Sequence, residues 1–125
     1  MTAEQDNLAG RRILMVEDEM MLALLIGDYL ETLGCRVCKA GRLDKALALA
    51  QSETLDGVLL DLNLGGKSSA PVAAELDRRG IPWIVTTGYN ADRLPDEQRG
   101  RPVLQKPYLL EDMEQLMVAT FKAEQ

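Results

Sequence analysis

Five short apolar runs, each followed by a stretch with helical periodicity or by a polar loop, constrain the fold of this 125-residue chain more than any other feature. Gly, Pro or charged residues bound the runs, which lie at 12–16, 35–40, 57–61, 81–87 and 102–105. Apolar runs of this length are typical of strands buried on both faces of a parallel sheet. The alternation therefore predicts a doubly wound, three-layer α/β domain with a parallel sheet at its centre.

Apolar residues at helical spacing predict helices between the strands. The first helix is predicted to end at Gly34, and its core face comprises Leu22, Leu25, Ile26, Tyr29, Leu30 and Leu33. A second helix is predicted over 43–50 and a third over about 69–79, with Ser69 as its N-cap. The last helix carries its apolar residues between 110 and 121, and the polar stretch 90–100 contains Pro95, so any helix there is expected to be short.

The length and net charge of the chain limit the classes of function that it can have. The chain fits one domain, predicted over residues 11–122 after a flexible tail of residues 1–10. Its net charge of −6 argues against binding to DNA or to an anionic membrane. The longest apolar run, Met20 to Ile26, is far shorter than the roughly 20 residues needed to cross a bilayer. The polar start of the chain has no signal-peptide pattern, so the cytoplasm is the expected location.

The two cysteines and the absence of histidine exclude several kinds of chemistry. Cys35 and Cys38 form a C-x-x-C pair within a predicted strand, where residues three apart point to opposite faces. A redox pair would instead be expected at the start of a helix, which favours a structural role for these thiols. With no histidine, the chain has no Ser-His-Asp or Cys-His apparatus and no imidazole ligand for zinc.

Polar side chains stand at the ends of four of the predicted strands. They are Glu17-Asp18, Asp61, Thr87 and Lys106. Because ligands of an open parallel sheet bind outside the carboxyl ends of its strands, these side chains are expected to converge at one site. Three carboxylates, one hydroxyl and one ammonium indicate a site for a divalent cation and a phosphoryl group.

Each group also has a simpler interpretation. Acidic residues after the first strand suit the N-terminus of a helix, where they complement the dipole, and a lysine after a strand is often a solvated surface residue. Asp61 is harder to explain in this way, because it ends the apolar run Val58-Leu59-Leu60 and a lone buried carboxylate is costly. A carboxylate there can act as a nucleophile that accepts a phosphoryl group. Lys106 and a cation would then neutralise the phosphoryl oxygens, and Thr87 would hydrogen-bond one of them.

These motifs together resemble the receiver domain of bacterial two-component response regulators. The matching segments are Val16-Glu17-Asp18, Leu60-Asp61-Leu62-Asn63, Thr87-Gly88 and Lys106-Pro107. The resemblance implies a flavodoxin-like sheet with strand order 2-1-3-4-5 and a CheY-like, single-domain switch rather than an enzyme. It also implies that Asp61 is the phosphoacceptor and that Thr87 and Lys106 contact the phosphoryl group. The implied ligands of Mg²⁺ (or Mn²⁺) are Glu17, Asp18, Asp61 and the backbone carbonyl of Asn63.

The same resemblance implies partners. The phosphoryl donor would be a histidine kinase or a His-containing phosphotransfer protein, and the output would be altered protein contacts or onward transfer of the phosphoryl group. The start of the last helix has no Ser, Thr, Asp or Asn cap before its apolar run, so an exposed Tyr108 or Leu109 would mark a partner surface.

One position departs from the receiver pattern. Many receivers carry an aromatic residue three positions before the lysine, where this chain has Val103. A valine has no ring to rotate between buried and exposed positions, so we hypothesise that Tyr89, with the loop 90–100, carries the switch instead. The alternative is that Tyr89 merely packs over the site. The Thr-Gly-Tyr stretch with this replacement resembles single-domain receivers linked to stress-response phosphorelays.

Two other functions are weighed against the switch. An aspartyl-nucleophile phosphatase would need an acid two residues after Asp61, where Asn63 cannot serve in proton transfer. A receiver-like domain that is never phosphorylated would act only by protein contact, although every phosphorylation residue is present.

Overall fold

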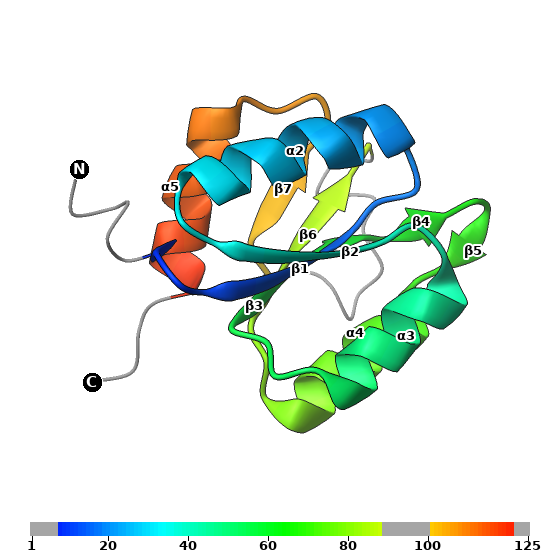
Figure 1. Cartoon of the computed structure of the whole chain (residues 1–125). Coiled ribbons are helices and arrows are strands. Elements are labelled where there is room, and N and C mark those ends of the chain that lie inside the picture. The colour runs from blue at the N-terminus through cyan, green and yellow to red at the C-terminus, as the bar shows by residue number, and fades with distance from the viewer. Residues whose placement is uncertain (1–7, 89–100, 122–125) are drawn as a thin grey trace.

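The computed structural model describes residues 8–88 and 101–121, which form a central parallel sheet between two helical layers (Figure 1). The strand order is β2-β1-β3-β6-β7, and every neighbouring pair is parallel. Their bounds are Arg12–Val16 (β1), Arg36–Ala40 (β2), Gly57–Asp61 (β3), Trp83–Thr87 (β6) and Val103–Gln105 (β7). Because β6 and β7 are the fourth and fifth strands of this sheet along the chain, the predicted order 2-1-3-4-5 is confirmed.

Within the part of the chain that the structure describes, two helices cover each face of the sheet. Helices α2 (Met20–Thr32) and α5 (Leu110–Thr120) lie on one face, and α3 (Leu43–Ser52) and α4 (Ala70–Arg79) lie on the other (Figure 1). Helix α4 ends at Gly80, which adopts the left-handed conformation (φ 72°) that glycine tolerates without strain. Because helices cover both faces of this parallel sheet, its inner strands β1, β3 and β6 are buried and read as apolar runs, whereas the edge strands β2 and β7 are partly exposed.

Strand alternation divides the core into two clusters. In β1, Ile13 and Met15 pack toward α2 and α5, whereas Leu14 and Val16 pack toward α3 and α4. The same period of two places Cys35 in the α2/α5 cluster and Cys38 against the α3/α4 cluster. Both thiols are free, and the predicted placement of the two side chains on opposite faces is confirmed.

The core face predicted for the first helix is partly wrong. Ile26 and Leu30 are fully buried as expected, and Leu22 and Tyr29 pack at the edge of the core, but Leu25 is 55% exposed. The residues buried along α2 are Ala23, Ile26, Gly27 and Leu30. The helix is therefore rotated toward its small residues, which let it lie close to the sheet. The run from Met20 to Ile26 is apolar on every side, so its periodicity does not identify the buried face.

Two further differences lie at the ends of elements. Residues 8–10 were expected in the flexible tail, but Leu8 is fully buried in the α2/α5 cluster. The loop expected after the third strand contains a short antiparallel hairpin, β4 (Asn63–Leu64) and β5 (Lys67–Ser68). Helix α5 begins without a side-chain cap, as predicted, with Glu111 and Asp112 in its first turn. Among the described residues, no helix combines the length and the apolar character needed to cross a bilayer.

Candidate functional site

The carboxyl ends of the strands place the predicted polar residues together. Strand β3 ends at Asp61, which pairs in register with Thr86 of β6, and β1 lies on the other side of β3. Glu17 follows β1 directly, and its amide donates to the carbonyl of Ala40 at the end of β2 (3.0 Å). Lys106 follows β7, and its amide donates to the carbonyl of Thr87 (2.8 Å). The expected convergence at this edge of the sheet is therefore present.

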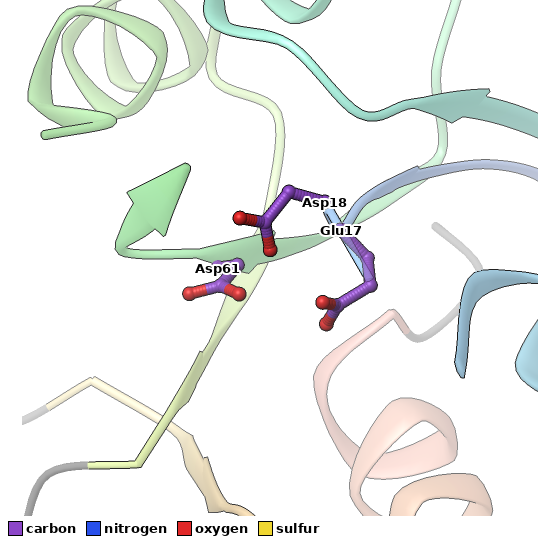
Figure 2. A group of neighbouring side chains, drawn as sticks. All are labelled: Glu17, Asp18 and Asp61. Carbon is purple, nitrogen blue, oxygen red and sulfur yellow. The ribbon is translucent and has the colours of Figure 1, made fainter. Parts of the chain in front are cut away.

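Three carboxylates form the centre of the site. Glu17, Asp18 and Asp61 each offer an oxygen, and these oxygens all lie within 4.8 Å of one another. Figure 2 shows Glu17 and Asp18, from the segment after β1, facing Asp61 at the end of β3. Glu17 and Asp61 are buried, whereas Asp18 is exposed. Carboxylates held this close repel one another, and a hard divalent cation relieves that repulsion.

Lys106 bridges two of the three carboxylates. Its Nζ lies 2.7 Å from Oε1 of Glu17 and 2.8 Å from Oδ2 of Asp61. Burial lowers the pKa of Lys106, but the hydrogen bonds and charges of Asp61 and Glu17 together outweigh burial and raise that pKa above its ordinary value. Lys106 is thus a fully charged ammonium at neutral pH. It is not a solvated surface lysine.

Burial also acts on the acidic and phenolic groups around Lys106. Burial raises the pKa of Glu17 above its ordinary value, and the hydrogen bonds from Lys106 and from the amide of Glu19 oppose this increase. Burial and the charge of Glu17 raise the pKa of Tyr108 to about 12. The Tyr108 phenol therefore stays protonated and neutral at neutral pH. Among the described residues, Lys106 is the only cationic side chain that forms an ion pair with Glu17 and Asp61.

Hydrogen bonds hold both the side chain and the backbone of Asp61. The Asn63 amide donates to Oδ1 of Asp61 (3.0 Å), and the fully buried Ser69 hydroxyl donates to the Asp61 carbonyl (2.7 Å). Ser69 is the N-cap residue of α4 by position, as predicted, but its side chain makes no capping hydrogen bond. It connects α4 to the end of β3 instead, a role that the capping pattern did not reveal.

The β4–β5 hairpin holds the exposed carboxylate. The Gly65 amide donates to Oδ2 of Asp18 (2.8 Å), and the Gly66 amide donates to Oδ1 of the Asn63 side chain (2.8 Å). Neither contact was predicted. The Gly-Gly pair flanked by short strand segments was the available signal, since such pairs favour two-residue hairpin turns.

The structure describes the positions of Thr87 and of the switch candidate Val103, but not that of the other candidate, Tyr89. Thr87 is buried at the end of β6, beside the carboxylates in the sheet order. Val103 is half-buried and packs against the α3/α4 cluster, as an aliphatic residue at the edge of a core does. Tyr89 and the loop 90–100 lie outside the described residues, so the hypothesis about Tyr89 stays a prediction.

The donor set fits the implied metal. Mg²⁺ takes oxygen ligands and is commonly held by one or two carboxylates together with water and phosphate oxygens. Glu17, Asp18 and Asp61 supply such oxygens within reach of one ion, and the described residues of the site include no thiol or imidazole that would favour a softer metal. The carbonyl of Asn63 as a further ligand stays a prediction.

An apolar surface adjoins the site. Large hydrophobic side chains are exposed along the first half of α2 and in the loop before α5, namely Met20, Met21, Leu24, Leu25 and Leu109. Of the two residues whose exposure would mark a partner surface, Leu109 is 62% exposed and Tyr108 is half-buried. A groove of about 420 Å³ runs from Leu22 and Leu25 to Lys106 and Tyr108. Exposed apolar patches of this kind commonly mark protein-binding surfaces.

Comparison with known proteins agrees with this architecture. A family model described as the response regulator receiver domain matches residues 13–118. The transcriptional regulatory protein PdtaR of Mycobacterium tuberculosis is 26% identical over 117 residues, which cover 90% of this chain and 57% of PdtaR. The chain spans about half the length of the curated relatives it matches.

Solved structures share the fold over nearly the whole chain. The receiver domain of sensor histidine kinase PA1611 from Pseudomonas aeruginosa PAO1 has a magnesium ion coordinated in its active site cleft. It is 26% identical to this chain, with a TM-score of 0.78, over 90% of this chain and 98% of that one. SdrG from Sphingomonas melonis Fr1 is 37% identical, with a TM-score of 0.77, over 88% of this chain and 95% of SdrG.

Proposed function

The chain belongs to the response regulator receiver domain family, and on that premise we propose that it is a phosphorylation switch whose acceptor is Asp61. Receiver domains are switch domains of two-component signal transduction. The observation that carries the proposal is the position of the Asp61 carboxylate. It ends the central strand, lies in a three-carboxylate cluster and contacts Lys106 at 2.8 Å.

The chemistry assigned to the chain is a single displacement at phosphorus. An oxygen of the Asp61 carboxylate attacks the phosphorus atom of a phosphohistidine on the donor. The O–P bond forms as the N–P bond breaks, and the electron pair of the broken bond stays on the donor nitrogen. Asp61 becomes an acyl phosphate, and the remaining task of the site is to position this group and neutralise its charge.

The neighbouring residues carry that task. The Asn63 amide and the Ser69 hydroxyl hold Asp61 in place before the reaction. Lys106, already charged and within 2.8 Å of Asp61, pairs with a phosphoryl oxygen, and the Thr87 hydroxyl donates to another. When bound, Mg²⁺ supplies further positive charge for the phosphoryl oxygens. Glu17, Asp18, Asp61 and the Asn63 carbonyl would hold it.

We assign the phosphoryl donor to the apolar surface beside the site. A histidine kinase or a His-containing phosphotransfer protein must bring its imidazole to Asp61, so its docking face has to lie next to the carboxylates. The groove that reaches Lys106 is lined by Leu25 of the exposed α2 residues and by Tyr108, which precedes the exposed Leu109. The output is a change of protein contacts or onward transfer of the phosphoryl group. A role in a stress-response phosphorelay is the finer proposal, supported by the Thr-Gly-Tyr stretch and Val103.

The decisive test is acceptance of a phosphoryl group from acetyl phosphate. With Mg²⁺ present, the intact mass of the protein should increase by one phosphoryl group, and Asp61→Asn should abolish the increase. Asp28→Asn, which changes an exposed aspartate on α2 that has no contact in the site, is the matched control and should be labelled like wild type. Labelling of Asp61→Asn would overturn the assignment of the acceptor. If the wild type gains no mass from acetyl phosphate or from a histidine donor, the unphosphorylated interaction domain becomes the better reading.

A separate test concerns the route by which phosphorylation reaches the surface. If Tyr89 replaces the aromatic residue missing at Val103, Tyr89→Ala should leave labelling of Asp61 intact but reduce the difference in partner binding between the phosphorylated and free protein. A pull-down with and without a stable phosphoryl mimic measures that difference, and Tyr89→Phe is the control that keeps the ring. An unchanged difference in Tyr89→Ala would mean that the ring only packs over the site.

A further inference from the structure

We propose that the Gly65–Gly66 turn is a positioning element for Asp18, so that the cation affinity of the site depends on the geometry of the β4–β5 hairpin. The inference rests on the proposed function, because it assumes that Asp18 is a cation ligand. It adds a backbone amide, remote in sequence from the carboxylates, to the groups that prepare the site.

The three carboxylates are not held equally. Glu17 and Asp61 are buried, and each contacts Lys106 and one backbone amide. Asp18 is exposed, and within residues 8–88 and 101–121 its carboxylate has a single hydrogen-bond partner, the Gly65 amide at 2.8 Å. The orientation of Asp18 therefore depends on the hairpin, whereas the other two carboxylates are oriented by the core of the site.

An exposed carboxylate needs such a partner in order to bind a cation well. A free aspartate side chain samples several rotamers, and a cation that binds it must pay for the loss of that freedom. A ligating carboxylate commonly gives one oxygen to the metal and accepts a hydrogen bond at the other. The Gly65 amide occupies Oδ2 of Asp18 and leaves Oδ1 for the ion.

The turn can place that amide only in one backbone conformation. Gly65 and Gly66 both have positive φ, 57° and 87°, as the two central residues of a type I′ hairpin turn require. The side chain of Asn63 accepts from the Gly66 amide at 2.8 Å and fixes the turn. At the base of the hairpin, Leu64 is buried in the α3/α4 cluster at 3% exposure, so the turn is anchored to the core.

The hairpin offers a matched set of variants. A Cβ at Gly65 would meet nothing within 4 Å, so a substitution there acts through the backbone and not through a clash. Gly65→Val opposes the positive φ strongly, whereas Gly65→Asn suits it, because Asn is favoured at the first central position of a type I′ turn. Gly80→Val is the control for strain alone. Gly80 also has a positive φ (72°) and open space around it, but it lies at the far end of α4.

The measurement is the dissociation constant for Mg²⁺, obtained by calorimetric titration of the full chain. Loss of a partner that orients a metal ligand typically weakens metal binding about 10- to 100-fold, and Gly65→Val should fall in that range. Gly65→Asn and Gly80→Val should both bind Mg²⁺ like wild type. If Gly65→Val prevents folding, Gly65→Ala tests the same backbone conformation with a smaller side chain. Wild-type affinity in a folded Gly65→Val or Gly65→Ala, or an equal loss in Gly80→Val, would overturn the proposal.

A double variant shows whether the turn acts through Asp18. Asp18→Asn should itself weaken Mg²⁺ binding, and Gly65→Val should then weaken it little further, because the two changes remove the same interaction. Losses that add in full would overturn the proposal, since the turn would then act by another route. Failure of the proposed function looks different. Wild-type protein would show no Mg²⁺ binding and no mass gain with acetyl phosphate, and both proposals would fall together.

Discussion

At the scale of single residues, Lys106 and Asp18 show two ways of preparing a charged side chain. Lys106 is placed by its strand and is held between Glu17 and Asp61 at 2.7 and 2.8 Å. Its charge offsets part of the repulsion between these acids, which allows both to be buried. Asp18 is exposed and depends on one amide from a neighbouring turn. Lys106 is thus held by groups within the site, whereas the orientation of Asp18 can change with any contact that moves the hairpin.

The cysteines give a prediction at the same scale. Burial raises the pKa of Cys35 to about 11, and its Sγ donates to the carbonyl of Leu8 at 3.5 Å. Because only the thiolate is alkylated and Cys35 is buried with a raised pKa, Cys35 should react slowly with iodoacetamide at pH 8, and the less buried Cys38 should react faster. Raising the pH toward 11 should increase the Cys35 rate by about tenfold per unit. Peptide mapping by mass spectrometry measures both rates, with urea-unfolded protein as the control. Equal rates in the native protein at pH 8 would contradict the burial of Cys35.

At the scale of elements, α2 presents two apolar faces with different roles. Ala23, Ile26 and Leu30 face the sheet, whereas Met21 and Leu24 are 73% and 46% exposed. The buried set maintains the fold, so the exposed set is free to bind a partner.

Charged substitutions on α2 separate these roles. Met21→Asp and Leu24→Asp should change the free energy of unfolding by no more than about 0.5 kcal/mol, as is usual for surface positions. Both variants should still be labelled by acetyl phosphate but should lose transfer from any histidine-phosphorylated donor that labels wild type. Glu31→Lys, exposed near the far end of the same helix, is the control and should accept normally. Undiminished transfer to Met21→Asp and Leu24→Asp would place the donor on another face.

The helices and strands also show how much of the fold can be predicted from the sequence. The strands β1, β3 and β6 were predictable because each is a buried apolar run between turn residues. The buried face of α2 was not, because Met20–Ile26 is apolar all round and the helix packs through Ala23 and Gly27 instead of Leu25. The sequence predicts only a loop where the hairpin forms, since the hairpin strands are only two residues long.

In the site too, the sequence predicts some contacts and not others. The sequence predicts the proximity of Glu17, Asp61 and Lys106, because side chains at the carboxyl ends of parallel strands in one sheet lie at the same edge. The Gly65 amide was missed because every residue but proline carries an N–H, so a backbone donor leaves no mark in the sequence. The Ser69 hydroxyl was assigned to a cap because position alone does not say whether it turns to the helix or to Asp61.

At the scale of the whole molecule, a close contact joins the C-terminal end of the last helix to the central strand. Phe121 is 1% exposed, and a Cβ at Gly57, the first residue of β3, would lie 2.6 Å from its ring. Glycine at this position lets the ring lie directly on the start of the central strand. The contact lies at the opposite end of β3 from Asp61, so it should affect stability without altering the chemistry.

This contact predicts a specific pattern of stabilities. Phe121→Ala should lower the free energy of unfolding by about 3–5 kcal/mol through the cavity it leaves. Gly57→Ala should cost about 1–3 kcal/mol by overpacking against the ring. In the double variant the added methyl group has room, so the losses should be clearly less than additive, and urea unfolding of the four proteins measures this. Full additivity would show that the two residues do not share a contact.

The position of Phe121 also bears on where a label or tag can be attached to this protein. Leu8 and Phe121, the first and last residues that the structure describes, belong to the same core cluster, and Phe121 lies at the amino end of β3. A fluorophore, an affinity handle or a fused reporter joined beyond either residue would thus start from the side of the sheet remote from the carboxylates. Immobilisation through either end should leave the face that receives the phosphoryl donor open to solution.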